Sequence, residues 1–288
     1  MKLFLPLTLA VTALTGVAPA VVVNFDFNRR LPGDDDSNVA TETYIGLGAA
    51  PDSVGNTHWN SVRRNGSTSF SSSAALNTPI LDSSGANSNV SVSIAAADLT
   101  NATIAQSKES LHQELGSSGA YENLMGDFLQ IHSGSAGTVA TAFGTIANLT
   151  AFASYEIYFY GQGATYGSPG NFTSGQNSLF AITNTLGGST IGTAEQTGWD
   201  GVNGGNGTLD EGVEYVKFLG TANASGQVFF RWENVVAGLN VTTDLATNED
   251  GESSEYGALN GIQIVAVPEP SLALLGGMGV LGLLRRRR

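Results

Sequence analysis

The sequence predicts an all-β protein, an antiparallel β-sandwich or jelly roll with a small helical insertion. Its 288 residues include 37 glycines, are 13% charged and contain no cysteine, a composition that favours short strands joined by turns. Alternating or aromatic-rich stretches, bounded by Gly, Asn, Ser or Pro, recur along the chain. These expected strands span residues 21–28, 90–94, 138–146, 155–160, 179–183, 213–219, 227–232 and 261–267.

Within this expected sandwich, residues 155–160 carry apolar groups on both faces, as in a central strand covered on both sides. Residues 213–219 and 227–232 flank a seven-residue loop that suits an antiparallel pair. Leu149 and Tyr155 resemble the tyrosine corner of Greek-key sandwiches, in which the tyrosine hydroxyl bonds back to the preceding turn. Residues 258–264 resemble the last strand of lectin-like and carbohydrate-binding jelly rolls.

One part of the chain has helical spacing. Apolar residues fall at i, i+3, i+4, i+7 and i+8 between Tyr121 and Leu129, and residues 107–115 precede them with Gly116 as a stop. We therefore expect one or two helices near residues 107–130, within a single domain of residues 21–267.

The net charge is unevenly distributed. Five of the 12 basic residues are Lys2 and residues 285–288, whereas 24 of the 25 acids lie between Val21 and Val267, which leaves that part with a net charge of −17. Such a body repels nucleic acid and anionic membranes, and it suits an exterior protein or a cation binder.

Residues 1–20 have the three parts of a secretory signal peptide. Lys2 precedes an apolar stretch, and Ala18 and Ala20 form a small-x-small site for signal peptidase. A short N-terminal core helix is the alternative, which Pro6 and Pro19 disfavour. We expect export through the Sec machinery, with no stabilisation from disulfides because the chain has no cysteine.

The C-terminal segment, residues 268–288, combines a Pro-Glu-Pro motif, an apolar stretch and a basic cluster. Pro268, Glu269 and Pro270 precede residues 271–284, which carry no charge, and the arginines follow as Arg285, Arg286, Arg287 and Arg288. This segment resembles the PEP-CTERM sorting signal of exported Gram-negative bacterial proteins. A plain C-terminal anchor or a core helix would also fit its hydropathy.

The resemblance implies recognition by a membrane-embedded exosortase-type protease and processing near the Pro-Glu-Pro motif. It also implies transient inner-membrane anchoring by the C-terminal helix, followed by transfer to the cell surface or extracellular matrix. Four arginines favour the cytoplasmic side of the membrane, which leaves the body outside. None of this assigns an activity to residues 21–267.

A catalytic set is not evident from the sequence. The chain has no Cys and no G-x-S-x-G motif, and its three histidines have no zinc-ligand spacing. Acidic runs such as Asp34, Asp35 and Asp36 could supply oxygen ligands to Ca²⁺, although solvated surface charge is the favoured explanation for them. No other cofactor is expected.

Two tryptophans suggest a ligand site. Trp59 and Trp199 lie in turn-like surroundings, and Trp199 is followed by Asp200, a combination suited to stacking on a sugar ring and bonding its hydroxyls. The alternative is that both rings plug the end of the sandwich.

Three functional hypotheses remain. The first is a non-catalytic exported protein that binds or joins extracellular polysaccharide. The others are a secreted glycan-active hydrolase that uses paired Asp or Glu residues and a purely structural surface protein.

Overall fold

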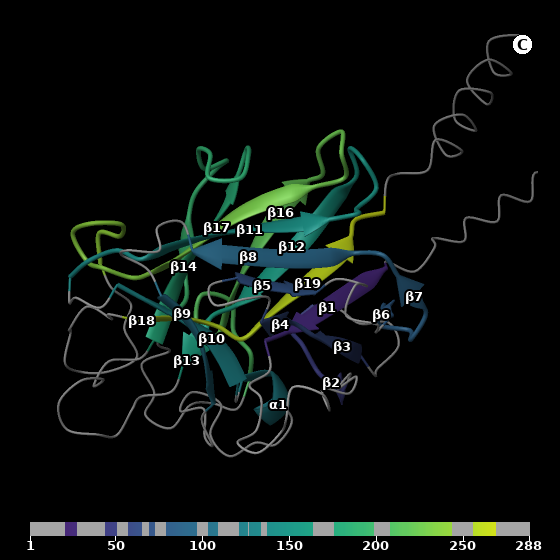
Figure 1. Cartoon of the computed structure of the whole chain (residues 1–288), viewed down its shortest axis with the longest axis horizontal. Helices are drawn as coiled ribbons and strands as arrows, with labels where there is room; N and C mark the ends of the chain where they lie inside the picture. Colours follow the sequence, from purple (N-terminus) through teal and green to yellow (C-terminus); the bar gives the residue numbers. More distant parts are fainter. Residues whose placement is uncertain are drawn as a thin grey trace, which may run out of the picture.

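The computed structural model is mostly β-strand with almost no helix (Figure 1). It describes residues 21–27, 44–50, 57–64, 69–72, 79–96, 103–108, 121–125, 127–133, 137–163, 176–198, 208–243 and 256–268. Each of the eight strands expected from the sequence is present within a few residues of its expected bounds. Alternation of apolar side chains was sufficient to find them because most have one face in the core.

Two large sheets pack face to face. The six-stranded sheet has the order β16 (Tyr215–Thr221), β12 (Ser154–Tyr160), β19 (Gly261–Ala266), β1 (Val22–Asp26), β3 (Thr57–Ser61) and β2 (Tyr44–Gly46). The eight-stranded sheet has the order β13 (Gln162–Gly163), β14 (Gln176–Thr183), β17 (Val228–Asn234), β11 (Thr141–Ala147), β8 (Ser91–Ala96), β5 (Ser69–Ser72) and β4 (Arg63–Arg64), and β15 (Glu195–Gln196) pairs with β14.

Smaller elements complete the fold. A three-stranded sheet has the order β18 (Tyr256–Leu259), β10 (Asp127–His132) and β9 (Thr103–Lys108), and β6 (Ile80–Leu81) pairs with β7 (Asn87–Ser88). The helix α1 spans only Glu122–Met125. Almost all pairings are antiparallel; β1 and β3 are parallel.

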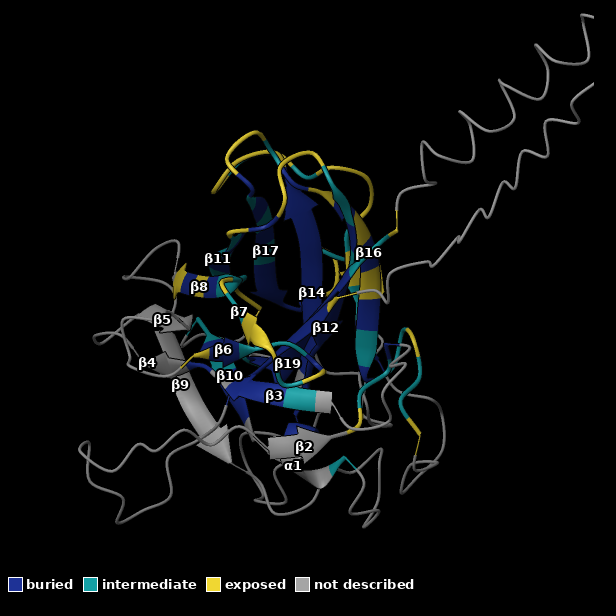
Figure 2. Ribbon diagram, turned by 90° about the vertical axis from the view of Figure 1, so that its right-hand side faces the viewer, coloured by how far each residue is buried: buried dark blue, intermediate teal, exposed yellow. Residues whose placement is uncertain are grey.

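The main core lies between the two large sheets and is centred on aromatic rings. Phe159 of β12 stacks on Phe180 of β14 with ring centroids 5.0 Å apart, and it also contacts Phe230 of β17 at 4.9 Å and Phe218 of β16 at 5.8 Å. All of these side chains are buried (Figure 2). Rings from both sheets therefore interdigitate, which is the packing expected of a sandwich.

A second cluster covers the other face of the six-stranded sheet. Its buried members include Tyr158 and Tyr160 of β12, Trp59 of β3 and Leu124 of α1. Because Ile157 and Phe159 of the same strand face the main core, β12 is covered on both sides. The prediction of a central strand at residues 155–160 is confirmed.

A buried amide network links the interior strands β19, β1 and β3 of this sheet. Gln263 of β19 donates to Asn24 Oδ1 at 2.7 Å, and its Oε1 accepts from the backbone N–H of Ala50 at 3.0 Å and from the Tyr160 hydroxyl. Asn60 donates to the backbone oxygens of Asn24 and Leu81. These bonds satisfy polar groups that would otherwise destabilise a buried position.

The predicted tyrosine corner is present between β11 and β12. Tyr155 is buried, and its hydroxyl accepts a hydrogen bond from the backbone N–H of Thr150 at 2.8 Å. Leu149 is buried in the same turn. Its backbone oxygen lies so close to Gly226, whose φ is +68°, that a Cβ at Gly226 would come within 2.2 Å of it. This turn carries the chain from the eight-stranded sheet to the six-stranded sheet.

The predicted helical insertion near residues 107–130 is wrong at both ends of that range, correct at residues 122–125, and outside the described residues over 109–120. Residues 103–108 form β9 and residues 127–132 form β10, so α1 is the only helical turn among the described residues of this region. Phe128, Leu129 and Ile131 are all fully buried, because β10 lies between β9 and β18 and is covered on both faces. An apolar residue on each face of a strand reproduces i, i+3 and i+4 spacing over a short run.

The predicted pairing of residues 213–219 with residues 227–232 is also wrong. β16 pairs with β12 in one sheet, whereas β17 pairs with β11 and β14 in the other. The intervening loop is closed by Asn223, whose Oδ1 accepts the backbone N–H groups of Ser225 and Gln227. The loop therefore connects the six-stranded sheet to the eight-stranded sheet.

Candidate functional site

Most residues that the sequence nominated for function lie outside the described residues. These are the signal-peptidase residues Ala18 and Ala20, the acidic run Asp34, Asp35 and Asp36, the pair Trp199 and Asp200, and the sorting residues Glu269, Pro270, Arg285, Arg286, Arg287 and Arg288. Pro268 is described; it is exposed and follows β19 directly. Within the described residues, no helix is long and apolar enough to span a bilayer.

Trp59 is a core residue and not the surface residue that its loop-like sequence context suggested. It lies in β3, is fully buried, and packs edge-on against Tyr160 with ring centroids 5.9 Å apart. Gly261 approaches so closely that a Cβ there would lie 3.0 Å from Trp59 Cζ3. A ring enclosed in this way is not available to stack on a sugar.

No group of three potential metal ligands comes together among the described residues. Near the start of β16, the carboxylate of Glu214 accepts the backbone N–H of Asp210 at 2.7 Å. That carboxylate therefore stabilises its own turn.

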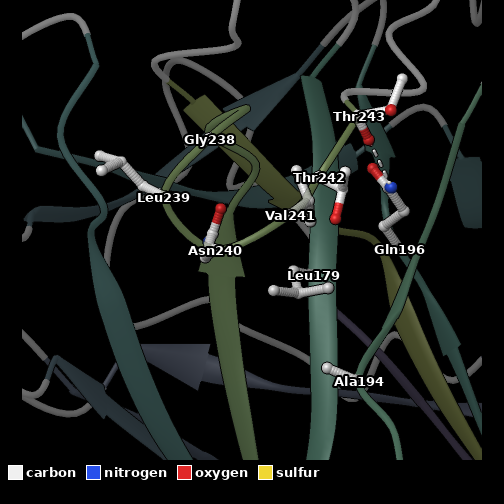
Figure 3. A pocket seen from close by; sticks show the side chains of 9 residues that line it. All are labelled: Leu179, Ala194, Gln196, Gly238, Leu239, Asn240, Val241, Thr242 and Thr243. Carbon is white, nitrogen blue, oxygen red and sulfur yellow. Dashed lines mark hydrogen bonds between the residues drawn. The ribbon is translucent and has the colours of Figure 1, made fainter.

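A surface groove of about 690 Å³ runs beside β14, where the turn after β17 faces the segment that carries β15 (Figure 3). Gln196 spans it by donating from Nε2 to the backbone oxygen of Thr243 at 2.9 Å. The lining combines apolar groups with amides and hydroxyls: Leu179, Ala194, Gln196, Gly238, Leu239, Asn240, Val241, Thr242 and Thr243.

The groove adjoins the outer face of the eight-stranded sheet. Along β17, Phe230 and Trp232 point into the core, so Phe229, Arg231 and Glu233 point outward by strand alternation. The register places Thr141 of β11 beside Glu233 and Phe143 of β11 beside Arg231. We call these five residues, Thr141, Phe143, Phe229, Arg231 and Glu233, the outer-face site.

The carboxylate of Glu233 is fixed by three neighbours. Thr141 Oγ1 donates to Oε1 at 2.9 Å, Arg231 Nε lies 3.4 Å from Oε1, and Asn240 Nδ2 donates to Oε2 at 3.3 Å. Asn240 also lines the groove, so it joins the groove to the outer-face site. The Arg231 side chain is 28% exposed, which leaves part of its guanidinium accessible to a ligand.

Two aromatic rings complete the outer-face site. Phe143 and Phe229 are half-buried, and they are diagonal neighbours because Phe143 pairs with Arg231, two residues from Phe229. The turn at Gly187 packs near one ring, since a Cβ at Gly187 would lie 3.4 Å from Phe143 Cε2. A partly accessible pair of rings next to an ordered ion pair suits a ligand with both apolar and hydroxyl-bearing faces.

The outer-face site is not predicted by the sequence. Alternation in residues 228–234 indicates which side chains point outward, but not that β11 and β14 lie on either side of them. At least 28 residues separate each of the three strands from the next in sequence, so only the fold brings their outward residues together.

The groove provides no paired carboxylates for glycoside hydrolysis, since none of its lining residues is Asp or Glu. Two described histidines lie away from the groove. His58 Nδ1 is 3.2 Å from the backbone oxygen of Ser83, and the His132 ring packs on the Tyr256 ring with centroids 5.0 Å apart.

No family model and no curated protein sequence matches the chain. Among solved structures, it is similar to the enzymatically active domain of tailspike protein 4 from bacteriophage CBA120 at 8% identity and a TM-score of 0.23, over 58% of this chain and 19% of that one. It is also similar to TmCBM61, solved in complex with β-1,4-galactotriose, at 8% identity and a TM-score of 0.25, over 61% of this chain and 88% of that one. At these TM-scores, neither likeness bears on the fold or the function.

Proposed function

We propose that the chain is an exported, non-catalytic protein that binds extracellular polysaccharide through the outer-face site and the adjoining groove. The observation that carries this proposal is the combination of partly exposed Phe143 and Phe229 with the ordered Arg231–Glu233 pair beside an open groove. Sugar rings present apolar C–H faces and hydroxyl edges, which match aromatic rings and charged hydrogen-bonding groups respectively.

The sequence signals support export as part of this proposal. Residues 1–20 suit the Sec machinery and signal peptidase, and residues 268–288 suit an exosortase-type membrane protease that processes the chain near Pro268. Mass spectrometry of the mature protein from its native host tests this part. An intact C-terminus that retains Arg288 would contradict processing.

The non-catalytic part of the proposal is supported by the groove lining and by the position of Glu233. Its carboxylate is bonded to Thr141, Arg231 and Asn240, and it has no acidic partner among the residues that line the groove. Retaining or inverting hydrolysis requires two carboxyl groups about 5 to 9.5 Å apart.

Polysaccharide binding is tested with the full chain on a glycan array, with and without EDTA. We expect binding that survives EDTA, and a loss of about 5- to 30-fold in affinity for Arg231→Gln or Phe143→Ala, equivalent to about 1–2 kcal/mol. Lys217→Gln is the matched control, because Lys217 is exposed on the outer face of the other sheet.

Four outcomes would count against the proposal. Absence of binding in both conditions would leave the purely structural hypothesis. Binding that Arg231→Gln and Phe143→Ala leave unchanged would place the ligand elsewhere, and binding abolished by EDTA would favour the Ca²⁺ hypothesis. Release of new reducing ends from a bound glycan would favour the hydrolase.

A further inference from the structure

Exposed apolar side chains are concentrated at one end of the sandwich. Seven large apolar side chains are exposed among the described residues. Five of them lie near the start of β1 and the end of β19, at the end of the sandwich that we call the exit end. These five, with their exposed fractions, are Val21 (52%), Phe152 (69%), Leu186 (58%), Ile191 (56%) and Leu219 (71%). Of the other two, Leu239 lies in the turn after β17, at the opposite end, whereas Leu47 follows Gly46 of β2, which pairs with Thr57 of β3 at the level of the start of β1.

Strand register defines this exit end. Ala266 donates to the backbone oxygen of Val21 at 3.0 Å, and Val267 donates to that of Ser154 at 2.9 Å, so the start of β1, the end of β19 and the start of β12 lie together. Phe152 donates to the backbone oxygen of Ala222 at 3.0 Å, which brings in the loop after β16.

The turn after β14 belongs to the same end. Thr183, the last residue of β14, pairs with Phe229 near the start of β17, and Val228 pairs with Ile146 near the end of β11. Leu186 and Ile191 lie in and just after this turn, and Figure 2 shows the loops beyond β14, β17 and β16 exposed at one end of the sandwich.

Three loops of the exit end carry no charge, although residues 21–267 have a net charge of −17. Residues 148–153, 184–192 and 221–227 contain no Asp, Glu, Lys or Arg. Two carboxylates lie beside these loops: Asp82, which bridges to Val23 and accepts from Ser84 and Ala86, and Glu156, which accepts from the Tyr158 hydroxyl.

Phe152 combines a left-handed backbone with an exposed aromatic side chain. It is a bulky side chain at φ +64°, a left-handed conformation that disfavours any residue with a Cβ. Burial does not compensate for this strain, since the ring is 69% exposed. A strained backbone that displays an aromatic ring to solvent is typical of a contact residue.

The sequence after β19 indicates what this end contacts. Only Glu269 and Pro270 separate Pro268 from residues 271–284, which carry no charge and precede four arginines. Two extended residues span about 7 Å. If residues 271–284 enter a bilayer, the exit end lies within about one headgroup layer of its surface.

We propose that the exit end of the sandwich, with Phe152 at its tip, docks on the headgroup interface of a lipid bilayer while the C-terminal segment is anchored. This inference rests on the proposed anchoring of that segment. Uncharged loops avoid the repulsion that the acidic body would otherwise have from lipid phosphates, and aromatic and aliphatic side chains partition favourably into the interface.

The absence of cysteine makes the test direct. The full chain is reconstituted in phosphatidylcholine vesicles with one introduced cysteine, labelled with an environment-sensitive fluorophore and read against lipids that carry a headgroup quencher. Phe152→Cys and Leu186→Cys report on the exit end, Leu239→Cys reports on the opposite end, and Ala273→Cys reports on the tail. Because two exit-end positions are labelled, one of them still reports on the exit end if the other variant misfolds.

We expect blue-shifted, quenchable emission from labels at positions 152 and 186, and emission from position 239 that matches the label in solution. A quenched tail label with unquenched labels at 152 and 186 would overturn the inference while leaving the anchoring intact. An unquenched tail label would contradict the anchoring itself and the docking with it. Equal quenching at 152 and 239 would also overturn the inference, because the body would then lie along the membrane.

Discussion

We predict that any side chain at Gly144, in the main core, destabilises the fold. It lies in β11 opposite Phe230 of β17, and a Cβ at this position would come within 2.0 Å of Phe230 Cζ and 2.3 Å of Cε1. Carbon atoms in ordinary contact are about 3.5–4.0 Å apart, so Gly144→Ala requires the ring or one of the strands to move.

The Phe230 ring has little space into which it could move away from a Cβ at Gly144. Its other neighbour is Phe159, with ring centroids 4.9 Å apart, and Phe159 is itself stacked on Phe180 at 5.0 Å. Overpacking a close-packed core destabilises by about 1–3 kcal/mol, and the aromatic stack places Gly144→Ala at the upper end, about 3 kcal/mol. The expected fall in Tm is about 6–12 °C for a domain of this size.

Denaturant unfolding followed by tryptophan fluorescence measures the change, with buried Trp232 as a reporter in β17. Gly220→Ala is the matched control. It is also a strand glycine, but the nearest atom to its added Cβ is the terminal Cδ1 of Ile157 at 3.1 Å, which can rotate away. Its expected change is within about 1 kcal/mol.

A double-mutant cycle tests the cause. Phe230→Leu in the Gly144→Ala background should recover part of the loss, with a coupling of at least about 1 kcal/mol. The reasoning would be refuted if Gly144→Ala were as mild as Gly220→Ala, or if the two substitutions were simply additive.

Two further predictions concern tyrosines. Tyr155→Phe removes the hydrogen bond from the Thr150 N–H and should lower the free energy of unfolding by about 1 kcal/mol, measured in urea; an unchanged midpoint would show that the corner bond contributes nothing. Burial raises the pKa of Tyr160 and of Tyr158 above the usual value near 10, and the bond from Tyr158 to Glu156 adds to the shift. Since the folded pKa is the higher one, this stability is complete below about pH 10 and is lost as the pH rises further, by up to about 1.4 kcal/mol per pH unit for each tyrosine. Tyr158→Phe should make the alkaline decline less steep, and an identical slope would contradict the assignment.

Strand positions could be predicted from the sequence, whereas strand partners could not. Alternation located β16 and β17 because each has one face in the core. A seven-residue loop fits a hairpin and a crossing between sheets equally well, and the choice depends on β12 and β11, which are remote in sequence. The tyrosine corner was predictable because its hydrogen bond joins residues five positions apart.

The errors at Trp59 and in residues 127–129 have a common cause. Both segments were interpreted from their own composition, but each is buried by elements that the local sequence does not indicate. Trp59 is enclosed by Tyr160 and Gly261, and β10 is covered on both faces as the central strand of its sheet. Fully buried strands carry apolar groups on both faces and so lose the period-two signal.

The groove and the proposed membrane-facing end lie at opposite ends of one strand, whereas Phe229 and Phe143 of the outer-face site lie nearer the membrane-facing end, next to Val228 and Gly187 respectively. The exit end includes the turns beside Val228, the first residue of β17, whereas the groove is formed by the turn that follows Asn234, its last residue. Seven residues of strand separate the two by about 20 Å. With the exit end on a bilayer, the groove would point away from the lipid and remain open to polymers outside the membrane. The groove is therefore accessible in the docked state, and ligand contact with Phe143 and Phe229 would take place close to the membrane surface.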